Sequence, residues 1–191
     1  MSVSELVRTP RVASGLSQSS LAALADVPQP TISGIETGTH DATVKLVERL
    51  LAPIGYRLVA IPTQAQTVAE TAVAVASLLR AGREGAAYRQ LIQLLDDLAA
   101  ESPHARVLLT ATPPAPVGDR RYDAYIAAAS EHRLREVKAP LPEWVHEPER
   151  VVDPVWYPAG IASLKDATVK ITPPSFRRHG LIVDGADLVS V

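Results

Sequence analysis

The segment from Gly15 to Glu36, with the sequence GLSQSSLAALADVPQPTISGIE, constrains the fold of this chain more than any other. Ser17 precedes a run of apolar residues at helix spacing and is suited to be the N-cap of a helix. Asp26-Val27-Pro28 predicts a turn, and Pro30 falls in the first turn of a second helix, where its missing N–H costs no hydrogen bond. The pattern therefore predicts two short helices joined by a tight turn.

The second of these helices has two different faces. Ile32 and Ile35 are spaced so that both point inward. The outer side is left with small or polar residues, namely Gln29, Thr31, Ser33 and Gly34. Two short helices joined by a tight turn, the second exposing such residues, form the layout that places a helix in the major groove of DNA.

Residue types and spacing agree with one known family along this whole stretch. The matching residues are Gly15-Leu16-Ser17-Gln18, Leu21-Ala22, Val27 to Ser33, Ile35-Glu36 and Gly38, followed by a helix with Val44, Leu46, Val47, Leu50 and Leu51. On these residues, the chain from about Val3 to Leu51 resembles the Cro/phage-repressor helix-turn-helix family, also called the Xre type. The resemblance implies a five-helix DNA-binding domain whose third helix reads the bases.

The resemblance also implies which residues meet a double-stranded operator. Gln18 would touch a phosphate or support base readout, and the third helix would lie in the groove, where Gln can pair with adenine and Thr can contact the thymine methyl group. The residues that it assigns to DNA binding are Gln18, Gln29, Pro30, Thr31, Ser33, Gly34, Thr37, Thr39 and Lys45. Thr37, Thr39 and Lys45 would approach the DNA backbone.

Other positions bear on structure or depart from the family pattern. Arg11 and Glu36 match two positions that form an internal ion pair in this family. An Arg between two packed helices needs such a partner for its charge. The family often has Arg or Lys where this chain has Gly34. Pro10 falls inside the expected first helix, and Thr9-Pro10 is an alternative start that would split that helix in two.

Charge limits how strongly one copy can bind DNA. The chain carries 19 Lys+Arg and 21 Asp+Glu, and its net charge is −2. The basic residues of the first 62 positions are Arg8, Arg11, Lys45, Arg49 and Arg57, and acidic residues are equally frequent there. Since DNA-binding domains normally show a basic surface, we expect weak binding per monomer and reliance on a dimer or on several sites.

A strand is predicted directly after this domain. Ile54 to Pro62 alternates apolar and polar residues and ends in Pro. A single strand leaves backbone groups unpaired, and pairing with the same strand of a second chain would give a two-fold dimer. The alternative is pairing within the chain, with a strand predicted over Arg106–Thr112.

The rest of the chain predicts a mainly α fold with a Pro-rich, mixed α/β C-terminal part. Helix spacing and the break at Gly82 predict a helical hairpin over about 68–103, and Asp119 is a good N-cap for a helix to about Val137. Ala167–Ile171 and Leu181–Val183 are further candidate strands. The expected domains are 1–52 for DNA binding, 53–62 for the strand, 63–118 for the hairpin and a short strand, and 119–191 for partner binding.

The C-terminal region is similar, at scattered positions, to tails of bacterial regulators encoded beside nucleotidyltransferase-type toxins. This implies an antitoxin whose C-terminal part neutralises a toxin and whose N-terminal part represses the shared promoter. Candidate partner-binding residues are Tyr122, Trp144, Trp156, Tyr157, Phe176, Arg177 and Arg178. Alternatively, the aromatic residues form a small core under a loop-rich region. The alternative for the two arginines is that they are surface charges without a partner.

Several classes of function are disfavoured. The chain has no Cys, which excludes disulfide scaffolds and Cys-ligated metal sites. No apolar stretch is long enough to span a bilayer and no signal-peptide pattern is present, so we expect a soluble cytoplasmic protein. The His residues are His40, His104, His132, His146 and His179, without a zinc-protease spacing. We therefore expect no enzyme activity, cofactor or metal. The alternatives to an antitoxin repressor are a protein-interaction module on a helix-turn-helix scaffold and a ligand-responsive or phage-type repressor.

Overall fold

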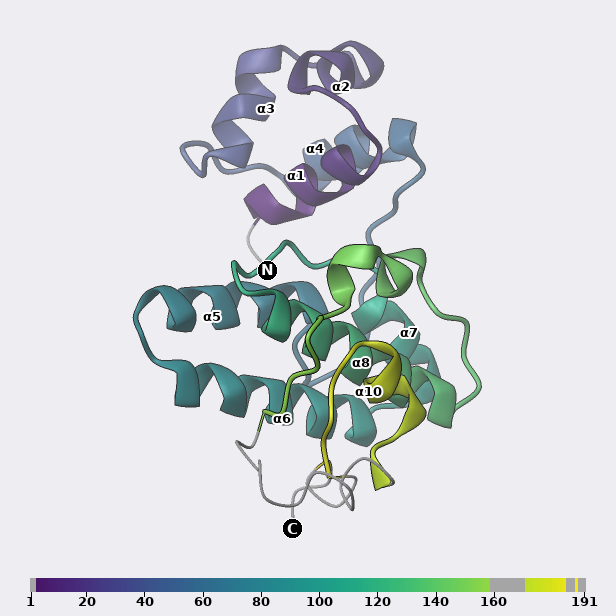
Figure 1. Ribbon diagram of the computed structural model, residues 1–191. Helices are drawn as coiled ribbons and strands as arrows, with labels where there is room; N and C mark the ends of the chain where they lie inside the picture. Colours follow the sequence, from purple (N-terminus) through teal and green to yellow (C-terminus); the bar gives the residue numbers. More distant parts are fainter. Residues whose placement is uncertain (1–2, 159–170, 185–187, 189–191) are drawn as a thin grey trace. The chain divides into compact units, whose positions relative to one another are not determined.

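The computed structural model describes residues 3–158, 171–184 and 188 (Figure 1). The chain divides into two compact units, Met1–Ile61 and Pro62–Val191. In the described residues, the regular structure is helical and contains no strand. An isolated parallel bridge joins Trp156 and Leu181. The prediction of a mainly α fold is thus confirmed, whereas its β component is not found in those residues.

Unit 1, Met1–Ile61, holds the helices that surround the predicted turn. Ser17 accepts a hydrogen bond from the N–H of Ser20 and caps α2, and Asp26 ends that helix in the left-handed conformation, with φ 51°. Pro30 lies in the first turn of α3. Within residues 3–61 the elements are α1 (Val3–Ala13), α2 (Gln18–Ala25), α3 (Gln29–Glu36), α4 (Val44–Leu51) and the 3-10 turn η1 (Ala52–Ile54). Residues 3–51 thus form four α-helices, where the resemblance implies a domain of five.

A small aliphatic core holds these helices together. It draws on every α-helix of the unit, and α1 packs against both α3 and α4. Its buried members are Val7, Leu21, Ala22, Ala25, Ile32, Ile35, Val47, Leu50 and Leu51. The inward spacing of Ile32 and Ile35 therefore fixes which side of α3 remains available to a ligand.

The first helix is not split at Pro10. This residue is buried inside α1, which runs unbroken from Val3 to Ala13. Because proline lacks an N–H, the hydrogen bond to the carbonyl of Leu6 cannot form at this point. Packing of α1 on α3 and α4 outweighs that cost, and the alternative start at Thr9-Pro10 is not used.

The strand predicted over Ile54–Pro62 is wrong. After η1, residues 56–63 have no regular secondary structure in the described chain. The alternation has a different cause, since Ile54, Tyr56 and Leu58 pack against the core of unit 1 while Arg57 and Val59 are exposed. Alternating burial needs only an extended backbone on an apolar surface, whereas a strand also needs a partner strand.

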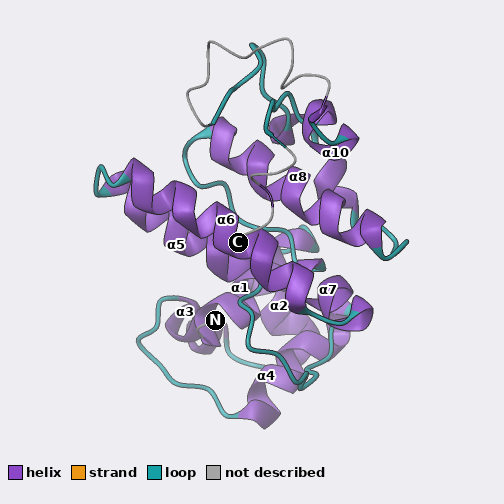
Figure 2. Ribbon diagram, turned by 90° about the horizontal axis from the view of Figure 1, so that it is seen from below, coloured by secondary structure: helices purple, strands orange, loops and turns teal. Residues whose placement is uncertain are grey.

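Unit 2, Pro62–Val191, is built around α8. Its elements in the described residues are α5 (Val68–Arg80), α6 (Glu84–Ala100), α7 (Pro103–Thr110), α8 (Arg120–Glu136), the 3-10 turns η2 (Glu143–His146) and η3 (Pro148–Arg150), and α10 (Pro174–Arg178). The helices α5 and α6 lie side by side as a hairpin, as predicted, and Gly82 takes φ 68° in the turn between them (Figure 2). The helices α5, α6, α7 and α10 all pack on α8, whose central residues are buried on every side.

The strand predicted over Arg106–Thr112 is also wrong, because this segment lies in α7 and the turn after it. The side chain of Ser102 accepts a hydrogen bond from the N–H of Ala105, and Pro103 takes the first helical position. Pro103 therefore follows the end of α6 and also begins α7, because proline fits readily in the first turn of a helix. Pairing of this segment with residues 54–62 is excluded by its helical backbone.

The C-terminal strands predicted from the sequence are not confirmed. Leu181–Val183 contributes only the bridge at Leu181, and most of Ala167–Ile171 lies outside the described residues. In the part of the chain that the structure describes, no helix is long and apolar enough to cross a membrane.

The short helix α10 is held on α8 by one aromatic anchor and a buried carboxylate. Phe176 has no exposed surface and meets the Tyr125 ring edge-on, with the ring centroids 5.3 Å apart. The fully buried Glu131 pairs with Arg178 and, at 3.1 Å, with Nε2 of His179. Burial lowers the pKa of His179 despite this carboxylate.

Candidate nucleic-acid interface

The side of α3 that faces away from the core carries the residues assigned to base readout. Gln29, Thr31 and Ser33 are partly exposed, and Pro30 is exposed. These residues follow one another along α3, directly after the turn that ends α2 (Figure 1). The structure therefore brings the predicted groove residues together on one surface.

A chain of hydrogen bonds runs from Arg11 to Gln29. Arg11 binds Glu36 through both oxygens of the carboxylate, with Nε–Oε1 at 2.6 Å and Nη2–Oε2 at 2.8 Å. The Nε2 of Gln18 donates to Oε2 of Glu36 at 2.9 Å. The Nε2 of Gln29 then donates to Oε1 of Gln18 at 2.9 Å. We call these four side chains the glutamine relay.

The carboxylate sets the direction of the whole relay. An ionised carboxylate can only accept hydrogen bonds, so Gln18 must turn its NH₂ group toward Glu36. The carbonyl oxygen of Gln18 then faces Gln29, which must donate from its own NH₂ group. The amide orientation of Gln29 is thus fixed by a buried charge that it does not touch. What remains of the Gln29 amide is its carbonyl oxygen and one N–H.

The pKa of Glu36 agrees with a permanently ionised relay. Burial raises this pKa, but the hydrogen bonds from Arg11 and Gln18 and the charge of Arg11 outweigh burial and hold it below its usual value. A carboxyl whose pKa is lowered by folding stabilises the fold above its unfolded pKa. That stabilisation is lost as the pH falls through the lowered pKa, so the relay is intact at neutral pH.

The hydroxyl groups of Thr37 and Thr39 are engaged at the end of α3. Thr37 Oγ1 donates to the carbonyl oxygen of Ser33 at 2.8 Å, and Thr39 Oγ1 lies 3.2 Å from that of Gly34. Both side chains therefore complete the C-terminus of α3, a role that the sequence reasoning did not include. Lys45, which was also assigned to DNA binding, is exposed on α4.

Part of the positive charge of unit 1 is already used inside the protein. Arg11 is committed to Glu36, and Arg49 binds Asp26 at 2.8 Å together with the carbonyl oxygens of Ala25 and Asp26. Arg8, Lys45 and Arg57 are exposed. The arginine pairs reduce the charge that unit 1 can direct at phosphates.

Sequence reasoning missed His40 as a neighbour of the interface. Its backbone N–H donates to the carbonyl oxygen of Gly34 at 3.1 Å, and its ring covers that glycine. No local pattern indicates this contact, because it depends on how the turn after α3 folds back. Gly34 is buried for this reason, although it lies outside the core.

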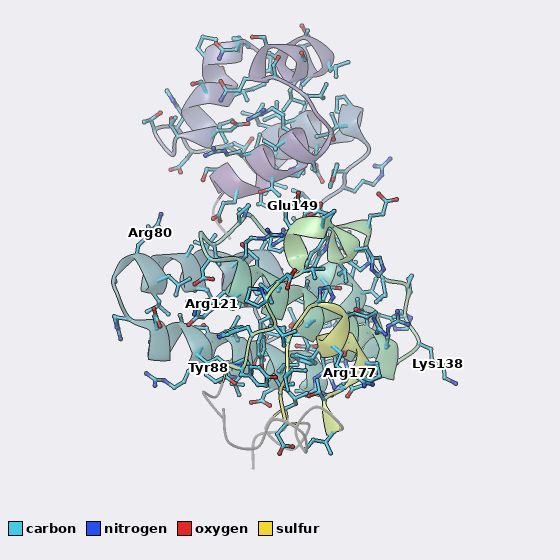
Figure 3. All side chains as sticks on the ribbon, in the orientation of Figure 1. Arg80, Tyr88, Arg121, Lys138, Glu149 and Arg177 are labelled. Carbon is cyan, nitrogen blue, oxygen red and sulfur yellow. The ribbon has the colours of Figure 1, made fainter. Side chains whose placement is uncertain are left out.

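The candidate partner-binding residues of unit 2 divide into buried and exposed ones. Tyr122, Trp144 and Phe176 are buried in the core, and Trp144 Nε1 donates to the carbonyl oxygen of Thr110 at 2.9 Å. For these three residues, the structure agrees with the alternative that they form part of a core. Arg177 and Arg178 are exposed at the end of α10. Figure 3 labels Arg177 there.

Trp156 and Tyr157 are half-buried. Trp156 lines an open hollow of about 330 Å³ together with Arg120, Arg121 and residues 152–155. The guanidinium carbon of Arg121 lies 5.3 Å from the centre of the Trp156 ring, at cation–π distance. Arg121 is also bound to Asp119 at 2.6 Å, so this cation is largely neutralised.

Comparison with known proteins identifies unit 1. Residues 8–61 match a family model described as helix-turn-helix, and this segment is a helix-turn-helix domain of the Cro/phage-repressor (Xre) type. Comparisons with curated proteins and with solved structures found no match.

Proposed function

We propose that this protein is a sequence-specific DNA-binding transcription regulator, and that α3 reads the bases of its operator. The glutamine relay is the observation that carries this proposal. It presents the Gln29 amide with a free carbonyl oxygen and a free N–H, the acceptor and donor that pair with N6 and N7 of adenine. Pre-orientation of that amide reduces the entropy cost of binding.

We further propose that two copies bind one operator. Arg11 and Arg49 are engaged within unit 1, so few cations of one copy are available to phosphates. Each phosphate neutralised contributes about −0.9 to the slope of log K against log salt. A single unit 1 would therefore bind weakly and with a shallow salt dependence, and a pair of units would compensate.

Replacement of the reading residues tests this function. The double variant Gln29→Ala/Thr31→Ala is expected to weaken binding to the preferred DNA sequence by about 1–3 kcal/mol for each base-specific interaction that it removes. Its melting temperature should stay unchanged, because both side chains are partly exposed. The measurement is fluorescence anisotropy with labelled duplexes at fixed salt.

Gln66→Ala is the matched control, since Gln66 is exposed and lies in the segment between the two units' helices. It should leave affinity unchanged. Equal affinity of the double variant and the wild type for the preferred sequence would show that α3 does not read bases.

The finer proposal is that unit 2 binds a protein partner, namely a toxin, and that the chain is its antitoxin and autorepressor. Support comes from apolar side chains left exposed there, with Val155 47% and Ile171 52% exposed. Val155 lines the same hollow as the Trp156 ring, and exposed apolar groups beside an aromatic ring are common in binding surfaces. Trp156, Tyr157 and Arg177 are the candidate residues that are not part of the core.

Recovery of partners from the source cells tests the antitoxin proposal. The tagged full chain is expected to retain one stoichiometric protein together with DNA of its own promoter, identified by mass spectrometry and sequencing. A Trp156→Ala variant should lose the protein and keep the DNA. Recovery of DNA alone would contradict the antitoxin role and leave a stand-alone repressor. A protein without DNA would favour an interaction module on the helix-turn-helix scaffold.

A further inference from the structure

The centre of the outer face of α3 is nearly bare of side chains. Ile32, Ile35 and Glu36 are buried on the inner side of the helix. Because each residue of an α-helix turns the chain by about 100°, Pro30 and Gly34 lie opposite them, at the middle of the outer face. Neither residue has a side chain that can form a hydrogen bond. A reading helix with such a centre lacks a groove contact where one would be most effective.

The imidazole ring of His40 fills this gap. A Cβ placed on Gly34 would overlap Nδ1 of His40 and would lie 2.9 Å from both Cγ and Cε1 of the ring. The ring therefore occupies the space where a side chain at position 34 would begin. His40 itself remains exposed, so it covers the helix without entering the core.

The turn after α3 holds His40 in this place. The N–H groups of Thr39 and His40 both donate to the carbonyl oxygen of Gly34, at 2.9 and 3.1 Å. The Nδ1 atom of His40 is 3.4 Å from Oγ1 of Thr39. These two bonds hold the backbone of His40 against the end of α3, so that its side chain starts beside Gly34.

The geometry of the ring shows which atom is available to a ligand. In an imidazole, the Cδ2–Nε2 bond lies opposite Nδ1. Since Nδ1 is the ring atom closest to α3, Nε2 is on the side of the ring turned away from the helix. Within the described residues, Nε2 of His40 has no hydrogen-bond partner. An imidazole nitrogen in that position can donate to an acceptor on a base edge.

We propose that His40 is a specificity-determining DNA contact, which rests on the proposed function of α3 as the reading helix. His40 supplies, from the turn after α3, the groove contact that Gly34 cannot make. Its Nε2–H donates to a base acceptor in the major groove, such as N7 or O6 of guanine. Gly34 has the complementary role of leaving room for the ring.

The test compares variants of the full chain on the DNA sequence that the wild type selects from a random pool. His40→Ala is expected to weaken binding by roughly 5- to 150-fold and to relax base preference at one position. His40→Phe keeps a ring over Gly34 but removes the nitrogen, and it should lose the same preference. His104→Ala is the matched control, because His104 is exposed on α7 of unit 2, and it should bind as the wild type does.

Gly34→Ala tests the pairing of the two positions. The added methyl group overlaps the ring, which can swing away because it is the end of a flexible side chain. Gly34→Ala should therefore weaken binding when His40 is present and add little to His40→Ala, a coupling that a double-mutant cycle measures.

Different results overturn the inference and the proposed function. Wild-type affinity and base preference in His40→Ala, with a loss in Gln29→Ala, would overturn the role of His40 and leave α3 as the reading helix. Full binding by His40→Phe would reduce His40 to a packing residue and would also overturn it. Absence of any sequence preference in the wild type would remove the proposed function, and the inference with it.

Discussion

Arg11→Met is expected to unfold unit 1 while unit 2 stays folded. Arg11 makes two bonds to Glu36 and one, of 2.6 Å, to the carbonyl oxygen of Leu16. The side chain of Glu36 is only 4% exposed. Removal of one partner from a buried ion pair costs about 3–5 kcal/mol, because the remaining charge stays out of water. A unit of this size has a total stability of about 3–9 kcal/mol, so most or all of it would be lost.

Hydrogen exchange followed by mass spectrometry on the full chain measures this effect. Peptides from residues 3–61 should lose protection in Arg11→Met, and peptides from unit 2 should keep it. Arg49→Met is the matched control in the same unit, since Arg49 and Asp26 have side chains 52% and 98% exposed. Such a surface pair contributes about 0–1 kcal/mol.

A double variant without either charge of the pair checks the same explanation in a second way. Arg11→Met/Glu36→Leu replaces the pair by apolar side chains and should recover much of the protection, because no unpaired charge remains. The same variant should still fail to read DNA, since Gln18 no longer has the carboxylate that orients it. Full protection in Arg11→Met would contradict a large contribution of the buried pair to the stability of unit 1.

Phe176→Ala is expected to release α10 from α8 and to destabilise unit 2 by about 3–5 kcal/mol. The ring of Phe176 is fully buried and contacts the rings of Tyr125 and His132 edge-on, at centroid distances of 5.3 and 5.7 Å. Truncation removes this surface and leaves a cavity under a helix of five residues. A helix that short has little stability of its own.

Tryptophan fluorescence during thermal unfolding reports this change in unit 2 alone, because the chain has two Trp residues, Trp144 and Trp156, and both lie in that unit. The midpoint should fall by roughly 10 °C or more, given about 2–8 °C per kcal/mol for domains of this range. Leu108→Ala is the control, since Leu108 is 45% exposed on α7. Equal midpoints for Phe176→Ala and Leu108→Ala would show that Phe176 does not anchor α10.

The two helices around the predicted turn could be read from the sequence because their signals are local. Ser17, Asp26 and Pro30 act within one helical turn of their own position. The incorrectly predicted strands at 54–62 and 106–112 depended on distant partners. Alternating burial at 54–58 comes from packing on the core of unit 1. Ser102 and Pro103 begin α7, whereas a proline after a helix by itself indicates only that the helix ends.

The candidate site was partly predictable for the same reason. The positions on the outer side of α3 follow from helix periodicity and from the family resemblance. The glutamine relay does not, because Gln18 and Glu36 meet only after α2 and α3 have packed. The contact of His40 with Gly34 likewise needs the folded turn, and Thr37 and Thr39 had been assigned to the DNA backbone although their hydroxyl groups cap α3.

Selection from a random duplex pool by the purified full chain, at one fixed salt concentration, tests most directly whether unit 1 reads DNA sequence. We expect the wild type to enrich one motif that contains adenine at a defined position. The same selection with Gln29→Ala should show no base preference at that position. If two chains bind one operator, the motif should occur as two inverted copies. A selected pool indistinguishable from the starting pool would contradict sequence-specific binding and with it the central claim.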